Sequence, residues 1–262
     1  MHRTAEYDTF ADIYDVWVEM APSAHRALPF YVEAYLSSDD PVVELGVGNG
    51  RIALEAARQG KAIVGVDASA EMLRRCRERA EALGVADRLT LIQADFRDFQ
   101  LPEPAWLIAI PFHTIGHLVT PEAKREGLRH IYSQLAPGGR LILDHFIFRP
   151  EIARQHQAPS LRTEYTDPQT GHDVLLWVLT RYNFETQAMR ILAWTDELDD
   201  EGVLIRRRYR RLSFSWIEPD QMRALLEEAG FEIEALYGDF DRSPLTETSP
   251  EQVWIVRRPE RP

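Results

Sequence analysis

The sequence contains a single cysteine, Cys76, and only two lysines, Lys61 and Lys124, among 262 residues. One thiol cannot form an intrachain disulfide and is too few for a structural zinc site, which favours a reducing compartment. No stretch approaches the roughly 20 apolar residues that span a bilayer, and the polar N-terminus lacks the apolar core of a signal peptide. These absences predict a cytoplasmic protein with no membrane partner.

Positive charge is also scarce. The chain has 30 basic and 42 acidic side chains, so its formal net charge is −12. Such a surface would on average repel a phosphate backbone, so we expect no nucleic-acid partner. Hydrophobic residues make up 45% of the chain and charged residues 27%. This balance is typical of a globular protein and excludes a disordered or collagen-like one.

Between residues 41 and 148, short apolar runs alternate with helical patterns. The predicted strands cover residues 42–45, 62–66, 89–93, 106–110 and 140–144, and the predicted helices cover 51–59, 69–83 and 120–135. Strands and helices that alternate in units of about 25 residues are typical of a parallel sheet covered on both faces. The first forty residues are expected to add helices against this sheet.

The pattern changes after residue 150. Residues 151–165 are polar and predicted to be irregular, and three antiparallel strands are expected at 175–182, 190–198 and 203–216. A helix at 219–229 and strands at 231–237 and 252–258 follow. We therefore predict a core over residues 1–150, an inserted antiparallel β-sheet over 151–217, and a C-terminal part over 218–262 that completes the core.

An arginine-rich strand stands out in the insertion. Five arginines between residues 206 and 211 lie across a predicted turn from five acidic residues between 196 and 201. Cross-strand charge pairing on a solvated hairpin is the favoured interpretation. An anion-binding strand, or a contact between two copies in a homodimer formed through the insertion, is the alternative.

A glycine-rich turn joins the first predicted strand to the first helix. It contains Gly46, Gly48 and Gly50, and Asp67 ends the next strand 21 residues after Gly46. Glycines allow a ligand to approach the backbone, and a helix N-terminus offers unpaired N–H groups. An acidic residue at the end of the second strand is placed to bind ribose hydroxyls. The pattern predicts a nucleoside cofactor.

Two residues argue against a dinucleotide. Arg51 occupies the position where the dinucleotide fingerprint needs a small residue for close packing of helix and strand. The carboxylate of Glu44 would lie near a pyrophosphate of the same charge, whereas it suits a ligand that carries an ammonium group. A nicotinamide-dependent oxidoreductase is therefore the weaker alternative.

Five motifs in order resemble those of the class I S-adenosylmethionine-dependent methyltransferases. They are Val43–Gly50, Val66-Asp67-Ala68-Ser69, Gln93-Ala94-Asp95-Phe96, the turn Leu135–Leu141, and an N-terminal segment with Tyr7-Asp8 and Tyr14-Asp15. The resemblance implies an α/β fold with a Rossmann-like, seven-stranded, mostly parallel sheet whose last strand is antiparallel. It implies helices on both faces of this sheet and the antiparallel β insertion after strand five. It also implies that S-adenosylmethionine contacts Tyr14, Glu44, Gly46, Gly48, Gly50, Asp67, Ala68, Met72, Asp95, Phe96 and Pro111.

One departure from the family concerns strand four. Members often carry an aspartate near its start, where this chain has Pro104-Ala105-Trp106. The loop after that strand, Pro111-Phe112-His113-Thr114, also lacks the cluster of Asp or Asn that a metal-dependent, catechol-type enzyme would need. We expect no metal.

Histidines lie at the predicted carboxyl ends of strands four and five, where ligands bind in open α/β sheets. A methyl acceptor needs a free lone pair, and histidine is the usual side chain that accepts its proton near neutral pH. The candidate bases are His113, His117 and His145, the last with Asp144 as an orienting partner. Tyr14 is expected to contact cofactor or substrate through its hydroxyl, with Tyr7 as the alternative.

The stretch Phe112–Leu118, followed by an antiparallel insertion, is similar to that of aminosugar N-methyltransferases. The resemblance implies transfer of a methyl group to a nitrogen or oxygen of a small-molecule acceptor. An RNA or protein methyltransferase is the first alternative, and the negative net charge disfavours it. A module that binds the cofactor without catalysis is a further alternative that the sequence does not exclude.

Overall fold

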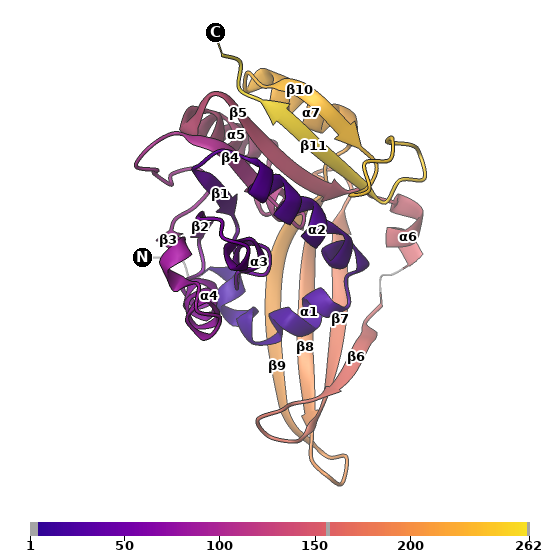
Figure 1. Ribbon diagram of the computed structural model, residues 1–262. Helices are drawn as coiled ribbons and strands as arrows, with labels where there is room; N and C mark the ends of the chain where they lie inside the picture. Colours follow the sequence, from indigo (N-terminus) through magenta and orange to yellow (C-terminus); the bar gives the residue numbers. More distant parts are fainter. Residues whose placement is uncertain (1–4, 156–157, 261–262) are drawn as a thin grey trace.

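The computed structural model describes residues 5–155 and 158–260 and contains two sheets (Figure 1). The larger sheet has seven strands in the order β10-β11-β5-β4-β1-β2-β3, and the smaller has four in the order β6-β7-β8-β9. Residues 1–4, 156–157 and 261–262, which fall inside the predicted core, insertion and C-terminal part, lie outside the described residues. The strands are β1 Val42–Leu45, β2 Ile63–Asp67, β3 Leu89–Gln93, β4 Ala105–Ile110, β5 Leu135–Phe146, β6 Ser160–Thr166, β7 Asp173–Asn183, β8 Ala188–Leu198, β9 Leu204–Ser215, β10 Glu232–Tyr237 and β11 Glu251–Arg257.

Helices cover both faces of the larger sheet, as predicted. Helices α5 and α7 pack their apolar residues on one face, and α2, α3 and α4 pack theirs on the other. The strands between them are apolar runs because both of their faces are buried, and β1 has no exposed residue. The helices are α1 Tyr14–Glu19, α2 Pro22–Ser37, α3 Ala53–Arg58, α4 Ala70–Ala82, α5 Pro121–Gln134, α6 Pro150–Gln155 and α7 Pro219–Glu228, with short 3₁₀ turns η1 Glu6–Thr9, η2 Ala11–Ile13, η3 Ala86–Arg88 and η4 Thr114–His117.

The last strand, β11, is antiparallel to its neighbours in an otherwise parallel sheet. It pairs with β5 in the register Glu251 opposite Phe146 and Arg257 opposite Arg140. Because β11 runs against β5, it begins at the edge of the sheet where β5 ends. The first residue of β11, Glu251, therefore lies at the carboxyl edge of the parallel strands, where ligands bind in this class of sheet.

The prediction that residues 151–165 are irregular is wrong for the described part of that segment. It contains most of α6 and most of β6, and β6 pairs antiparallel with β7. β6 is an edge strand whose residues are mostly partly or fully exposed, so it lacks the apolar alternation by which the other strands were found. The structure of β6 is determined by its pairing with β7. A local sequence pattern does not contain that long-range contact.

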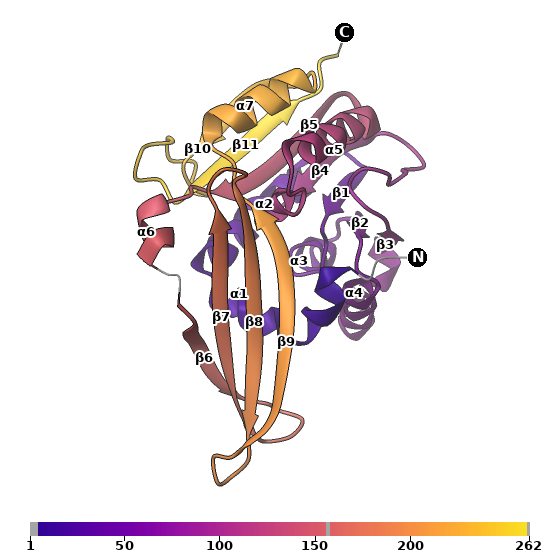
Figure 2. The same cartoon turned by 180° about the vertical axis from the view of Figure 1, so that it is seen from behind.

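The smaller sheet extends away from the body as a long blade, and one of its faces packs against the N-terminal segment (Figures 1 and 2). Leu176, Val178, Ala193 and Leu212 of the sheet form a core there with Phe10 and Ile13. The predicted charge pairing is confirmed for two of the arginines, since Arg206 binds Glu197 and Arg207 binds Asp196 across the hairpin. In the part of the chain that the structure describes, no helix is long and apolar enough to cross a bilayer.

Candidate active site

The glycine turn lies between β1 and α3, at the carboxyl edge of the larger sheet. Gly46 and Gly48 have φ values of 71° and 56°, a left-handed conformation that side chains disfavour. The N–H groups of Gly46 and Val47 both donate to the carbonyl of Val66, which ties the turn to β2. A side chain at Gly50 would meet Sγ of Cys76 at 2.7 Å, so this glycine lets the turn pack on α4.

The turn has the features of a cradle for a nucleoside cofactor. A Cβ atom added at Gly48 would lie 3.2 Å from Cε of Met72 and 3.6 Å from Oη of Tyr14. A side chain at this position would therefore take up space between the turn, α4 and the N-terminal segment. Tyr14 is the predicted cofactor contact, and the structure places its hydroxyl at the turn. The residues present thus fit a ligand that approaches the backbone at Gly48.

Asp67 ends β2 beside this cradle. Its two carboxylate oxygens accept hydrogen bonds from the N–H groups of Gly48, at 2.9 Å, and Ser69, at 2.8 Å. Burial raises the pKa of Asp67 to about 6, and these N–H donors oppose the shift. A carboxylate has about four acceptor sites, so Asp67 retains capacity for the hydroxyls of a ribose. Ala68, next in the chain, belongs to the same turn.

Asp95, predicted to meet the adenine, lies after β3. Its carboxylate receives two bonds from the guanidinium of Arg97, at 2.7 and 2.9 Å, and this pairing lowers the pKa of Asp95. The neighbouring Phe96 is buried in the core on that face of the sheet. Asp95 therefore stays ionised and partly exposed after β3, beside an apolar neighbour, and its predicted contact with the adenine remains a prediction.

Glu44 is buried at 3% exposure within β1, and Oε2 accepts a hydrogen bond of 3.0 Å from the hydroxyl of Tyr35 in α2. Burial raises the pKa of Glu44 to about 8, an effect that Tyr35 and Arg51 oppose. Arg51 itself donates to the carbonyl of Ala24 at 2.7 Å and so ties the turn to α2. The predicted role of Glu44 as a partner for an ammonium group remains a prediction, and the structure shows a carboxyl already bound beneath the turn.

The N-terminal segment, Glu6–Glu19, covers the cradle and is bound on two sides. On the core side, Ser69 donates to Asp8 at 2.6 Å, and Asn49 of the glycine turn donates to Asp15 at 2.8 Å. On the insertion side, the buried guanidinium of Arg210 binds the carboxylate of Asp12. The segment therefore connects the glycine turn of the core to the smaller sheet.

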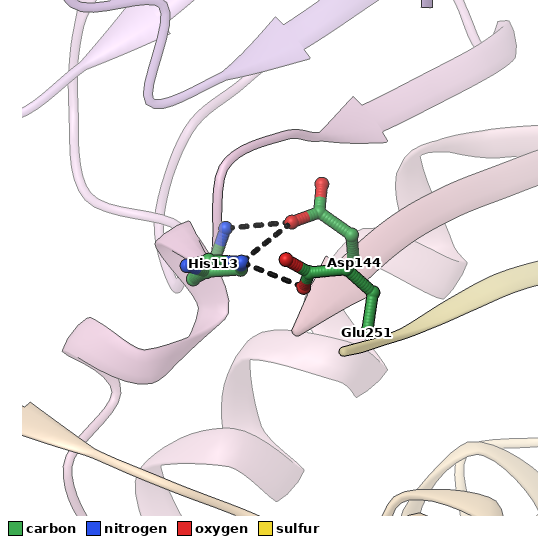
Figure 3. Close-up of side chains that lie close together, drawn as sticks. All are labelled: His113, Asp144 and Glu251. Atoms are coloured by element: carbon green, nitrogen blue, oxygen red, sulfur yellow. Dashed lines mark hydrogen bonds and ion pairs between the residues drawn. The ribbon is translucent and has the colours of Figure 1, made fainter. Parts of the chain in front are cut away.

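The loop after β4 carries two consecutive residues in the left-handed conformation, Phe112 at φ 58° and His113 at φ 61°. Such a pair of non-glycine residues is strained and persists only where its surroundings fix it. Here the carboxylate of Asp144 accepts the N–H groups of both residues at 2.9 Å, and it also accepts the hydroxyl of Tyr31 at 2.6 Å. Asp144 therefore holds the loop in the shape that positions the His113 side chain (Figure 3).

The imidazole of His113 points toward two carboxylates from different strands (Figure 3). Nε2 lies 2.8 Å from Oε2 of Glu251 and 3.6 Å from Oδ2 of Asp144. Burial alone would lower the pKa of His113, but the two carboxylates raise it above its ordinary value. Burial raises the pKa of Asp144, an effect that His113 opposes.

These three residues are the kind that bind metal ions, and their donor atoms lie within 4.8 Å of one another. However, both oxygens of Asp144 already accept hydrogen bonds, and the 2.8 Å separation of His113 and Glu251 is a hydrogen-bond distance. The arrangement is that of a histidine bound to carboxylates. The expectation of no metal therefore stays a prediction, now with a specific place at which to test it.

His117 lies one turn further, in η4. Its Nε2 is 3.2 Å from the hydroxyl of Tyr7 and its Nδ1 is 3.3 Å from the carbonyl of Ser213. Burial lowers the pKa of His117 to about 4, so the ring is neutral at physiological pH. With both nitrogens bound, His117 joins the N-terminal segment to the end of β9. Of the two tyrosines considered, Tyr7 contacts His117 and Tyr14 contacts the glycine turn.

His145 is fully buried within β5, and its Nε2 is 3.1 Å from the carbonyl of Ser215. Burial lowers its pKa well below the ordinary value, and its Nδ1 has no hydrogen-bond partner among the described residues. The predicted orientation of His145 by Asp144 is wrong, because successive side chains of a strand point to opposite faces. Asp144 instead binds the loop that carries His113.

Glu251 is the site residue that the sequence interpretation missed. It lies 138 residues from His113 in the chain, and no local motif joins the two. The usable signal was the expected antiparallel course of the last strand, because that course places its first residue at the carboxyl edge. Pro111 precedes the loop, and its carbonyl accepts the N–H and hydroxyl of Thr114, whose side chain lies against Gly46. The histidine loop and the glycine turn are thus in contact.

Part of the chain is similar to known methyltransferases. Residues 42–139 match a family model described as a methyltransferase domain. The carboxy-S-adenosyl-L-methionine synthase of Desulfotalea psychrophila is 32% identical over 132 residues, which are 45% of this chain and 53% of that protein. The chain thus spans about half the length of the curated relatives it matches most strongly.

Solved structures resemble the chain over nearly its whole length. The CcbJ methyltransferase from Streptomyces caelestis superimposes with a TM-score of 0.79 at 23% identity, over 98% of each chain. CalS10 from Micromonospora echinaspora, described as an amino pentose methyltransferase, has a TM-score of 0.67 at 18% identity, over 94% of this chain and 96% of its own. At these identities the likeness shows the fold. Residues 42–139 thus match a methyltransferase domain, and the chain as a whole has the fold of these methyltransferases.

Proposed function

We propose that the protein transfers a methyl group from S-adenosylmethionine to an amine nitrogen of a small molecule. The observation that carries the proposal is the position of His113. It is bound to Glu251 and Asp144 at the carboxyl edge of the sheet, in the loop whose Thr114 touches the glycine turn. A proton acceptor with two carboxylates beside it therefore lies next to the cofactor cradle.

The chemistry required of the protein is modest. S-adenosylmethionine supplies a methyl group on a positively charged sulfur, and this group is already activated toward a nucleophile. An amine is mostly protonated at neutral pH, so it must lose a proton before it can offer a lone pair. His113 can accept that proton, while the N-terminal segment over the cradle excludes water and holds the reactants in place.

The charge at His113 favours nitrogen over oxygen as the acceptor atom. Two carboxylates and one imidazole give this part of the site a net negative charge, which attracts a cationic ammonium group. A phenol or carboxylate acceptor would have to become or remain an anion beside Asp144 and Glu251, which like-charge repulsion disfavours. The description of the structural neighbour CalS10 as an amino pentose methyltransferase supports the same choice.

The partner we propose besides the acceptor is a second copy of the chain, bound through the insertion. Trp177 and Trp194 stack on each other at 6.1 Å across β7 and β8, and Tyr209 on β9 is next to Trp194 and 53% exposed. Sedimentation velocity of the wild-type protein and of Trp194→Glu tests this. A wild-type dimer that the substitution converts to a monomer supports the proposal, and a wild-type monomer at all concentrations refutes it.

An RNA or protein methyltransferase is the alternative function. It would need a surface that attracts RNA or a peptide, and the net charge of −12 disfavours RNA. A screen of amines, phenols, carboxylates, RNA and a peptide mixture with methyl-labelled cofactor separates these outcomes. Label transferred to amines only supports the proposal, whereas label transferred only to macromolecules or oxygen acceptors overturns it.

Calorimetry and two histidine variants complete the test. S-adenosylhomocysteine should bind the wild-type protein and fail to bind Gly46→Arg, because the new side chain would fill the turn. His113→Gln should keep the binding and lose most of the transfer to amines, by about 10²- to 10⁴-fold for a general base. His172→Gln is the matched control, because His172 binds Glu197 on the insertion. Full activity of His113→Gln would remove the assigned base.

A further inference from the structure

We propose that Glu251 is the positioning residue that fixes the proton of His113 on Nε2, so that Nδ1 presents its lone pair to the amine. The proposal rests on the proposed function for the identity of the acceptor. Glu251 lies in the last strand, distant in sequence from every recognised motif. With this role, Glu251 becomes part of the site that prepares the acceptor.

The contact between Glu251 and His113 is short and shielded from water. Oε2 of Glu251 is 2.8 Å from Nε2 of His113, and the glutamate side chain is 4% exposed against 17% for the histidine. A buried hydrogen bond with an ionised partner is stronger than one in water and aligns its donor closely. Glu251 starts a strand that is paired with β5 along its whole length, so its backbone is fixed.

The loop that carries His113 is fixed from the other side. Asp144 accepts the backbone N–H of His113 at 2.9 Å, and its Oδ2 is 3.6 Å from the ring nitrogen Nε2. The backbone of the histidine is therefore held by one carboxylate and its ring by another. With both fixed, the ring keeps one orientation, and the nitrogen that points away from the carboxylates is Nδ1.

The tautomer follows from the chemistry of the partner. An ionised carboxylate can only accept hydrogen bonds, so Nε2 must carry the proton that Glu251 accepts. A neutral imidazole then has its lone pair on Nδ1. Within residues 5–155 and 158–260, Nε2 is the ring nitrogen of His113 that is hydrogen-bonded, and the side chain keeps 17% of its surface accessible. In the proposed geometry, a ligand amine reaches Nδ1 through this accessible part of the side chain.

Titratable and charged groups of several described elements face the His113 ring. Glu251 on β11 and Asp144 on β5 favour the protonated form, and Arg26 on α2 opposes it. The Arg26 guanidinium lies 3.9 Å from Oε1 of Glu251 and is itself bound at 3.0 Å to Asp239. His145, with its ring centre 5.8 Å away, has a pKa well below the ordinary value and is neutral. The carboxylates therefore dominate, and Glu251 is the nearer to Nε2.

The proposed proton transfer runs from the acceptor to His113. The acceptor ammonium loses its proton to Nδ1 of His113, and the ring becomes an imidazolium whose Nε2–H still donates to Glu251. The freed nitrogen lone pair forms the new N–C bond to the methyl group, and the electron pair of the broken C–S bond stays on sulfur. The imidazolium, stabilised by Glu251, later releases its proton to water.

The test observes His113 directly and needs no substrate. Protein with ¹⁵N-labelled histidine is titrated, and long-range ¹H–¹⁵N spectra report the tautomer and pKa of each ring, with His113→Gln identifying the signal. We expect the Nε2–H tautomer in the wild-type protein. In Glu251→Gln, the pKa of His113 should fall by about one unit or more, as expected for loss of a charge within 4 Å. Glu234→Gln on β10, where Glu234 binds Arg140, is the matched control and should leave His113 unchanged.

Binding of S-adenosylhomocysteine by Glu251→Gln shows that the variant is folded, and Glu251→Asp is the second variant if it is not. The aspartate should restore part of the pKa and part of the activity, with kcat affected more than KM for the cofactor. An Nδ1–H tautomer in the wild-type protein, or an unchanged His113 pKa in both variants, overturns the proposal. So does activity that depends on added Zn²⁺ or Mg²⁺. If no amine is methylated, the proposed function fails, whereas the spectra still decide the role of Glu251.

Discussion

Replacement of Gly46 by alanine measures how closely the glycine turn and the histidine loop depend on each other. At φ 71°, any side chain costs about 1–2 kcal/mol of unfolding free energy, because the left-handed conformation brings Cβ against the backbone. The added Cβ would also overlap Cγ2 of Thr114, and overpacking typically costs a further 1–3 kcal/mol or so. We therefore expect Gly46→Ala to lose about 2–5 kcal/mol.

The chain offers a matched control for the backbone part of this cost. Gly84 has nearly the same φ, 68°, and a Cβ added there would have no neighbour within 4 Å. Gly84→Ala should therefore lose only about 1–2 kcal/mol. Thr114→Ser removes the overlapping methyl group and keeps the hydroxyl that binds Pro111, so Gly46→Ala/Thr114→Ser should recover the difference between the two alanine variants.

Urea unfolding gives the free energies, and calorimetry gives the affinity for S-adenosylhomocysteine. Gly46→Ala should bind the ligand at least about tenfold more weakly, which is 1.4 kcal/mol, because the turn must move away from Thr114. Gly84→Ala should bind it normally. Equal losses of stability in the two alanine variants, or no recovery with Thr114→Ser, would refute the contact between turn and loop on which the site geometry depends.

Three further predictions concern the cover over the cradle and the buried charges. Asp12→Asn should weaken the bond to the buried Arg210 by about 2 kcal/mol and speed the release of S-adenosylhomocysteine in stopped-flow measurements, and an unchanged rate argues against gating by the N-terminal segment. The raised pKa of Glu44 means that the folded state holds the extra proton between pH 4.5 and about 8, so stability should fall as pH rises through that window. Glu44→Gln should flatten this slope in urea titrations, and an unchanged slope contradicts the assignment. Burial lowers the pKa of Lys124 from 10.5 to about 8, so between about pH 8 and 10.5 the folded state holds fewer protons than the unfolded state. Stability should therefore rise with pH between about 8 and 10.5 in the wild-type protein but not in Lys124→Met.

The core of the fold could be predicted from the sequence because its signals are local. The apolar runs of β1 to β5, the helix predicted at 120–135 and the glycine turn each have their signal within a few residues. The strands and this helix lie within five residues of the predicted bounds, and β1 and β3 match them. β6 could not be predicted in this way. It is an edge strand whose structure comes from pairing with β7 and not from its own pattern.

Site residues that belong to a sequence motif could be predicted. Site residues whose position depends on pairing between distant strands could not. Asp67 and the glycine turn came from a motif, and the structure brings them into contact. Glu251 depends on the register of β11 against β5, which no motif encodes. The choice of partner for Asp144 failed for a related reason, since adjacency in a strand places two side chains on opposite faces.

The position of Glu251 in the last strand has a consequence for biosynthesis. During translation the glycine turn, the N-terminal segment and the loop with His113 all emerge before residue 150, and β11 emerges about a hundred residues later. A nascent chain can therefore assemble the glycine turn and its cover while His113 has Asp144 beside it but still lacks Glu251. With the proposed roles, the growing protein would be able to hold the cofactor before it could prepare an acceptor. The second ability would come only when the final strand pairs with β5.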